Sequence, residues 1–150
     1  MRRLHIVIVT LAVCHAIFSG PSSAGPADQT VSGLMEKWSA SFNKLDADAL
    51  ASLYSKNALF FGGTPPLYRD REGVTTYFST LPRWKSPTVQ FTDLAVNPIG
   101  ADVINVAATA IFVLGEDTPA VPFRLTWVII REDNDWKIVS HHASPRPTLK

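Results

Sequence analysis

The chain has 150 residues, of which 46% are hydrophobic, with 14 Lys+Arg against 13 Asp+Glu. This length fits one domain, and the apolar fraction is ordinary for a folded protein. Because the formal net charge is only +1 and no basic stripe is present, we expect no nucleic-acid partner.

Residues 1–24 have the pattern of a cleaved secretory signal peptide. Arg2 and Arg3 precede an apolar run over residues 6–18, and small residues follow up to Ala24. The run is shorter than the roughly 20 residues of a spanning helix, so no stable membrane anchor should remain after cleavage. We expect residues 25–150 to form a single exported domain, periplasmic or secreted. Cys14, the only cysteine, would leave with the signal peptide.

Three helices are predicted in the first half of this domain. From Thr30 onward, apolar residues recur at steps of three and four, as is typical of a helix: Val31, Leu34, Met35, Trp38, Phe42 and Leu45. A short second helix is predicted over residues 45–55, with Asp46 as its cap and Tyr54 on its apolar face. A short strand over residues 57–63 and a loop over residues 64–70 follow. Asp70 should then cap a third helix that ends before Pro82.

Four long strands are predicted in the second half, at about residues 88–96, 102–115, 120–131 and 136–144. The apolar phase changes within the first of them, which indicates a bulge near Thr92 and Asp93. The second is apolar on nearly both faces and should be central. Helices followed by hairpin-connected strands predict an α+β fold, with the helices on the concave side of a curved, mostly antiparallel sheet.

The only two histidines outside the signal peptide, His141 and His142, are adjacent in the last predicted strand. Neighbouring side chains of a strand point to opposite faces, so the pair cannot chelate one ion together, and we expect no metal site. If Lys137 faces solvent, regular alternation places Trp136, Ile138 and His142 inward and His141 outward. An inward His142 is a candidate general base, whereas the alternative is a structural histidine hydrogen-bonded in the core.

Three segments together resemble the SnoaL-like branch of the nuclear transport factor 2-like superfamily. They are a first helix that contains Trp38, followed by Leu53-Tyr54; a helix opened by Gly73 with Tyr77-Phe78; and the final hairpin from Phe123 to Ser144. The resemblance covers about residues 31–144. It implies a cone-shaped fold whose sheet encloses a pocket, and commonly a homodimer through the outer side of the sheet. Because the superfamily contains isomerases, dehydratases, cyclases and non-catalytic assembly domains, the fold alone assigns no activity.

The acidic residues do not supply an isomerase-type base. Such a mechanism needs a buried carboxylate with a raised pKa and an oxyanion donor. The Asp and Glu residues fall in predicted turns, caps and strand ends, for example Asp46, Asp70 and Glu116. Tyr54 and Tyr77 could donate to an oxyanion, although aromatic residues at helical spacing are more often part of the core.

These considerations predict an exported domain that binds a small apolar or acidic molecule without a cofactor. Arg124 would anchor an anion and His142 would bind a polar group, in a pocket lined by Trp38, Tyr54, Phe60, Asn105, Arg124 and His142. One alternative is an isomerase, dehydratase or cyclase with His142 as its catalytic base. Another is a non-catalytic dimeric assembly module.

Overall fold

The computed structural model of the protein describes residues 24–146. Their order along the chain is α1 (Pro26–Asn43), α2 (Ala47–Ser52), β1 (Tyr54–Phe61), β2 (Leu67–Arg69), α3 (Asp70–Ser79), β3 (Thr88–Pro98), β4 (Val103–Val113), β5 (Val121–Glu132) and β6 (Asp135–Pro145). The signal peptide prediction lies outside these residues except for Ala24. No helix among the described residues is both long and apolar enough to cross a membrane.

The helices begin where the sequence offers caps. Gly25 is the N-cap of α1, Pro26 follows it, and the Asp28 carboxylate accepts the Gly25 N–H at 3.0 Å. Asp46 caps α2 by accepting the Ala49 N–H at 2.9 Å, as predicted. The buried side of α1 consists of five residues from the predicted periodic set: Val31, Leu34, Met35, Trp38 and Phe42.

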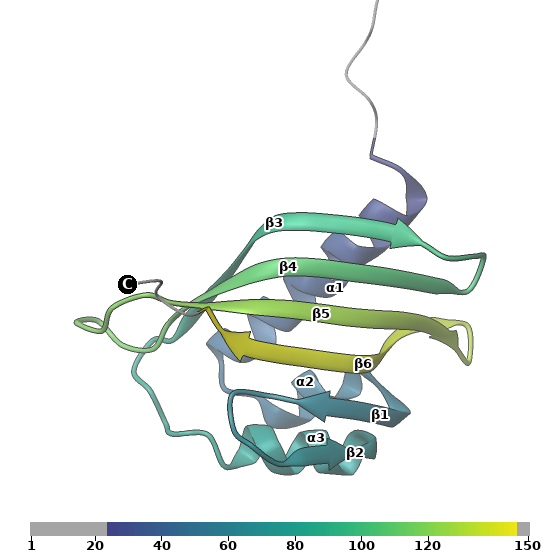
Figure 1. The fold of residues 1–150 in the computed structure, drawn as a ribbon. Coiled ribbons are helices and arrows are strands. Elements are labelled where there is room, and N and C mark those ends of the chain that lie inside the picture. The colour runs from purple at the N-terminus through teal and green to yellow at the C-terminus, as the bar shows by residue number, and fades with distance from the viewer. Residues whose placement is uncertain (1–23, 147–150) are drawn as a thin grey trace, which may run out of the picture.

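The strands form one six-stranded sheet in the order β2-β1-β6-β5-β4-β3 (Figure 1). All neighbouring pairs are antiparallel except β1 and β6, which are parallel. The β3–β4 register shifts between Thr92 and Ala95, which confirms the predicted bulge. β4 was predicted to be central but lies next to the edge strand β3, between β3 and β5.

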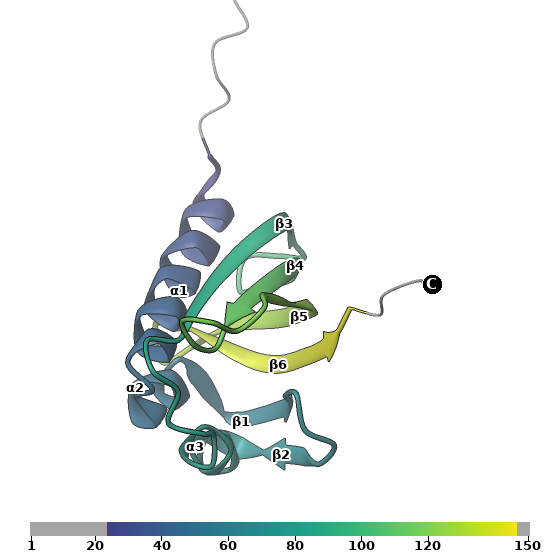
Figure 2. The ribbon, with the colours of Figure 1, turned by 90° about the vertical axis from the view of Figure 1, so that its left-hand side faces the viewer.

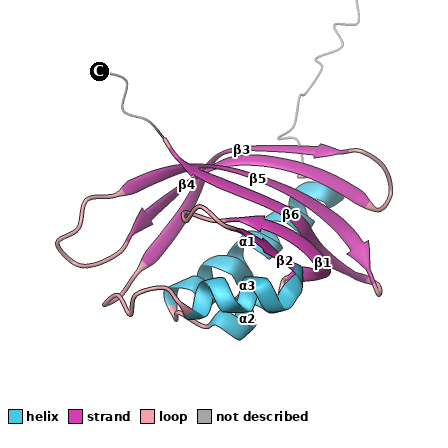
Figure 3. Cartoon of the chain, turned by 60° about the horizontal axis from the view of Figure 1, so that its bottom comes forward, coloured by secondary structure: helices cyan, strands magenta, loops and turns pink. Residues whose placement is uncertain are grey.

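The helices lie on one side of the curved sheet (Figures 2 and 3). We call the sheet face that meets the helices the inner face and the opposite one the outer face. Buried strand residues occupy the inner face, as Leu125, Trp127 and Ile129 do on β5. The α+β class with a mostly antiparallel sheet is therefore confirmed.

Two local predictions are wrong. Tyr54 is the first residue of β1 rather than part of the second helix, because α2 ends at its C-cap Leu53 and Tyr54 pairs with Ile138 of β6. The predicted loop at residues 64–70 contains β2, which pairs with the end of β1 through Leu59↔Arg69 and Phe61↔Leu67. The first error arises because pairing with the distant strand β6 overrides local sequence preference, and the second because the predicted loop folds back on β1 as a short hairpin.

Candidate functional site

An apolar cavity of about 100 Å³ lies between the helices and the inner face of the sheet. Eight aromatic residues from α1, β1, α3, β4, β5 and the segment after α3 line it: Trp38, Phe42, Phe60, Tyr77, Phe78, Trp84, Phe112 and Phe123. Gly62, Gly63, Leu81, Leu114, His141 and Ala143 complete the lining. Within the described part of the chain, no Asp, Glu, Lys or Arg belongs to this lining.

Trp38 of α1 packs against several aromatic rings of the interior. Its ring stacks on Phe42, with centroids 5.4 Å apart, and meets the edges of Phe78 and Phe112 at 5.9 and 6.2 Å. Aromatic pairs in these geometries add about 0.5–1.5 kcal/mol each beyond their buried area. The cavity wall is therefore held by ring contacts that α1 makes with α3 and β4.

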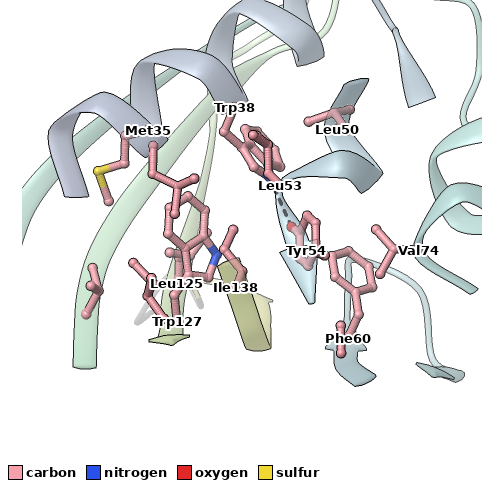
Figure 4. Packing of buried hydrophobic residues seen from close by; sticks show 14 of the residues in the cluster. Met35, Trp38, Leu50, Leu53, Tyr54, Phe60, Val74, Leu125, Trp127 and Ile138 are labelled. Atoms are coloured by element: carbon pink, nitrogen blue, oxygen red, sulfur yellow. Dashed lines mark hydrogen bonds between the residues drawn. The ribbon is translucent and has the colours of Figure 1, made fainter. Parts of the chain in front are cut away.

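A chain of hydrogen bonds joins four buried side chains. Trp38 and His141 line the cavity, and Tyr54 and Trp127 lie behind them. Trp38 Nε1–H donates to the Tyr54 hydroxyl at 3.0 Å, which Figure 4 shows as a dashed line. The Tyr54 hydroxyl oxygen lies 2.7 Å from His141 Nδ1, and Trp127 Nε1–H donates to the same nitrogen at 3.0 Å. The chain connects α1, β1, β6 and β5 through the protein interior.

These bonds assign the proton of His141. The indole N–H of Trp127 is only a donor, so Nδ1 must be an acceptor, and the neutral imidazole carries its proton on Nε2. The Tyr54 hydroxyl accepts from Trp38 and is thus free to donate its own proton to Nδ1. Among residues 24–146, every fully enclosed side-chain nitrogen or oxygen has a hydrogen-bond partner. Nε2 has no partner there and is therefore not fully enclosed, and His141 is one of the residues that line the cavity.

Burial keeps both polar members of the chain uncharged. Desolvation, together with a smaller effect of the neighbouring His142, lowers the pKa of His141 to about 3. Burial also raises the pKa of Tyr54 well above its ordinary value, although the bond from Trp38 opposes this. At neutral pH the cavity therefore meets a neutral imidazole that offers an N–H donor rather than a free base.

Tyr77 supplies a second polar group to the cavity. Its hydroxyl oxygen accepts the Gly63 N–H at 3.0 Å, and burial raises the pKa of this phenol. The Tyr77 and His141 rings both contact the Phe60 ring, with centroids 4.7 and 4.5 Å from it. The Tyr77 ring also crosses the backbone of Gly62 so closely that a Cβ at residue 62 would overlap it.

The predicted orientation of the histidine pair is wrong. His141 is buried, with 3% of its surface exposed, whereas His142 is exposed on the outer face beside Phe61. The cause is a bulge in β6: Val128 pairs with Ser140 and Ile129 with Ile138, which leaves Val139 unpaired. The extra residue reverses the alternation, so Ile138 and His141 both point inward. His142 is therefore not placed to act as a base in the cavity.

Arg124 and Asn105 also lie away from the cavity, contrary to prediction. Both side chains are exposed on the outer face. Leu125 and Trp127 occupy the inner face of β5, and Ile104 and Val106 that of β4, so alternation turns Arg124 and Asn105 outward. An anion in the cavity would have no contact with Arg124.

The other predicted pocket residues lie on the inner side. Trp38 and Phe60 line the cavity, and Tyr54 lies behind it, bound to His141. Sequence reasoning missed His141 as an inner residue, and it gave no role to Phe112, Phe123 or Ala143. Phe123 and Ala143 share the inner face with Leu125 and His141, so the correct β6 register would have identified them.

Charged groups gather outside the cavity, where β1, α3 and the end of β5 meet. Glu132 accepts from the Ser55 hydroxyl at 2.6 Å and lies 3.5 Å from the Arg71 guanidinium. The Ser55 bond is the main reason that the pKa of Glu132 is lowered. This group ties three elements together. Across residues 24–146, no three His, Cys, Asp or Glu side chains form a group that could hold a metal ion.

Comparison with known proteins finds relatives of the same fold. One solved structure, a calcium/calmodulin dependent protein kinase II association domain-like protein from Xanthomonas campestris, has 23% identity and a TM-score of 0.74, over 89% of this chain and 100% of its own. A dehydratase-like protein of the nuclear transport factor 2-like family from Streptomyces avermitilis has 20% identity and a TM-score of 0.70, over 80% and 96%. A hexachlorocyclohexane dehydrochlorinase from Novosphingobium barchaimii has 18% identity and a TM-score of 0.69, over 79% and 86%.

At these identities the likeness concerns the fold alone. A comparison with curated protein sequences finds no significant match. Among protein families, the SnoaL-like domain matches residues 31–148, which include every strand of the sheet and most of α1. The chain therefore belongs to the SnoaL-like family.

Proposed function

We propose that this protein is an exported SnoaL-like domain that binds a small apolar molecule in the aromatic cavity. The observation that carries the proposal is the character of the lining, in which eight aromatic side chains surround about 100 Å³ and the described residues contribute no charged group. Ligand sites are typically concave and mostly apolar, with a few polar groups that orient the ligand. His141 and Tyr77 are the polar groups in this lining.

The export part of the proposal rests on residues 1–24. Cleavage after Ala24 would leave α1 complete, because the helix begins at Pro26 with Gly25 as its N-cap. The new terminal nitrogen of Gly25 would remain beside the Asp28 carboxylate, which favours it electrostatically. N-terminal sequencing of the protein recovered from the periplasm or medium should begin at Gly25. Recovery of a chain that starts at Met1 would contradict export by cleavage.

Binding is favoured over catalysis because the cavity lacks a base. The names dehydratase and dehydrochlorinase describe the related proteins, and the fold they share supports many chemistries. Proton abstraction would need a group with a pKa near the working pH. No carboxylate lines the cavity among residues 24–146, and His141, with a pKa of about 3, has its acceptor nitrogen already occupied.

Filling the cavity tests the binding proposal. Ala143 lines it, so the Ala143→Leu variant should occupy part of the ligand space and weaken binding of neutral one-ring compounds at least about tenfold. Quenching of tryptophan fluorescence is a suitable measurement, since Trp38 and Trp84 also line the cavity. The matched control is Ala95→Leu on the exposed edge strand β3, which should bind normally. Equal affinities in both variants, or no binding by the unmodified protein, would contradict the proposal.

The outer face supports a homodimer as a second proposal. Leu59 and Phe61 of β1 are 45% and 41% exposed there, and Phe61 lies against His142. Adjacent exposed apolar side chains on a sheet commonly mark a contact surface. Light scattering should therefore give a dimer mass for the protein and a monomer mass for Phe61→Glu. Ile99→Glu, at a residue that is 63% exposed in the β3–β4 turn, should remain dimeric. A monomeric unmodified protein would exclude this interface.

A further inference from the structure

The hydrogen-bonding capacity of the cavity is one-sided. Among the described side chains of the lining, His141 Nε2–H and the Tyr77 hydroxyl each have a proton to donate, and the indole groups of Trp38 and Trp84 can only donate. The Nδ1 acceptor of His141 is already used by Trp127 and Tyr54, which lie behind the wall. The Tyr77 oxygen already accepts from Gly63 N–H. A ligand would therefore meet donors and few free acceptors.

The cavity is also an unfavourable site for a charged ligand. Burying an ion without a partner costs several kcal/mol. The described lining offers neither a cation for a carboxylate nor an anion for an ammonium group. Arg124, the predicted anion anchor, lies on the outer face and is separated from the cavity by the sheet. His141 cannot supply a positive charge near neutral pH because its pKa is about 3.

Size sets a third limit. An apolar cavity of about 150 Å³ is known to hold benzene, so a space of about 100 Å³ takes no more than one ring. The wall consists largely of aromatic faces and edges, which favour a flat ligand.

From these three limits we propose that the cavity selects a neutral molecule of about one ring that carries a hydrogen-bond acceptor, such as an aryl ketone. The acceptor oxygen would lie against His141 Nε2–H, with Tyr77 O–H as the second donor, and the ring would lie among Phe60, Phe78 and Phe112. This inference rests on the proposed function and deepens it by naming the ligand class.

A series of compounds of one shape tests the inference on the unmodified protein. Acetophenone, α-methylstyrene, benzoate and benzamidine each carry a trigonal group on a phenyl ring, and they differ in being a neutral acceptor, a neutral hydrocarbon, an anion and a cation. Tryptophan fluorescence and calorimetry at pH 7 should show acetophenone binding about tenfold or more tightly than α-methylstyrene, because it adds a hydrogen bond to an otherwise unpaired donor. Benzoate and benzamidinium should bind at least about a hundredfold more weakly than acetophenone.

Two further arms separate the causes. The two-ring ketone 2-acetonaphthone should bind at least about tenfold more weakly than acetophenone if the cavity volume limits the ligand. In Tyr77→Phe, the ratio of acetophenone affinity to α-methylstyrene affinity should fall several-fold. Acetophenone affinity should be constant between pH 5 and pH 8.

The outcomes distinguish the inference from the function beneath it. Equal binding of acetophenone and α-methylstyrene would overturn the inference and leave an apolar binding site. Tightest binding of benzoate or benzamidinium would overturn it as well, since the site would then contain a charge partner. If none of the four compounds bound, both the inference and the proposed function would fail.

Discussion

His141 is an inner member of the buried hydrogen-bond chain that runs from Trp38 through Tyr54 and His141 to Trp127. Its Nδ1 receives bonds from β5 and β1, and the Tyr54 hydroxyl extends the connection to Trp38 of α1. Such a network stabilises the fold only while each member stays neutral and paired. The imidazole thus has two roles, since one nitrogen holds the interior together and the other faces the cavity.

Protonation of His141 should make stability depend on pH. The imidazole titrates near pH 6.5 in the unfolded chain but near pH 3 in the folded protein, so the unfolded state binds the extra proton. Its contribution is complete above about pH 6.5 and is lost as pH falls toward 3. Between pH 7 and pH 4 the free energy of unfolding should therefore fall by about 3 kcal/mol more in the unmodified protein than in His141→Gln, measured by urea denaturation.

The matched control for this experiment is His142→Gln, which removes the exposed neighbouring imidazole. Most of the dependence on pH should remain in this variant, because desolvation, the main cause of the lowered pKa of His141, is unchanged. If the profile of His141→Gln ran parallel to both, His141 would not be held neutral by burial.

Removing the Tyr54 hydroxyl should lower the free energy of unfolding more than removing a tyrosine hydroxyl that makes no buried hydrogen bond. In Tyr54→Phe the buried Trp38 Nε1–H loses its acceptor, and we expect the free energy of unfolding to fall by about 1–3 kcal/mol. Tyr68→Phe is the control, because the Tyr68 hydroxyl makes no hydrogen bond within residues 24–146, and its effect should stay within about 0.5 kcal/mol. Equal losses in the two variants, measured by urea denaturation, would exclude a stabilising bond between Trp38 and Tyr54.

Among the elements, β6 matters most for the site because its bulge chooses which histidine faces inward. Residues 136–138 follow the alternation that the sequence predicts, and Ile138 is fully buried. Val139 then breaks the phase, and His141 and Ala143 take the inner face. If Val139 were paired regularly with β5 instead of forming the bulge, strand alternation would place His142 in the cavity and His141 on the outer face.

The spacing of apolar residues in the helices and strands was enough to predict most of the fold. The spacing of Val31, Leu34, Met35, Trp38 and Phe42 predicted α1, and the apolar set Leu125, Trp127 and Ile129 identified one face of β5. The site was predicted less well because it depends on register. The bulge in β3 changes the apolar phase of the sequence, whereas the bulge at Val139 of β6 was not recognised from the sequence. The sequence alone also did not show which β5 face meets the helices, so Arg124 and His142 were assigned to the wrong side.

Substitution by alanine at two glycines should change the free energy of unfolding in opposite directions. At Gly62 a Cβ would overlap the Tyr77 ring, so Gly62→Ala must displace Tyr77 or the β1 end and should lower the free energy of unfolding by about 1–3 kcal/mol. At Gly33, within α1, nothing lies within 4 Å of a new Cβ, and alanine should stabilise the helix by about 0.5–1 kcal/mol. Thermal unfolding checks both. Stabilisation by Gly62→Ala would show that Tyr77 does not pack across residue 62.

For the whole molecule, the two faces of the sheet have separate tasks. The inner face and the helices form a cavity to which the described residues contribute no charged side chain, whereas the outer face presents Leu59, Phe61, Arg124 and His142 to solvent or to a second copy. The α+β architecture with its helices on one side creates this division (Figure 2). The same division explains why residues predicted to share one pocket lie on opposite sides of a single sheet.

The central claim, that a neutral acceptor binds against His141, is tested most directly by NMR of the imidazole groups. In protein with ¹⁵N-labelled histidine, addition of acetophenone at neutral pH should shift the Nε2–H resonance of His141 and leave His142 unchanged. The two signals can be assigned with His141→Gln and His142→Gln. A shift of the His142 signal alone, or unchanged signals from both histidines while acetophenone is bound, would contradict the account.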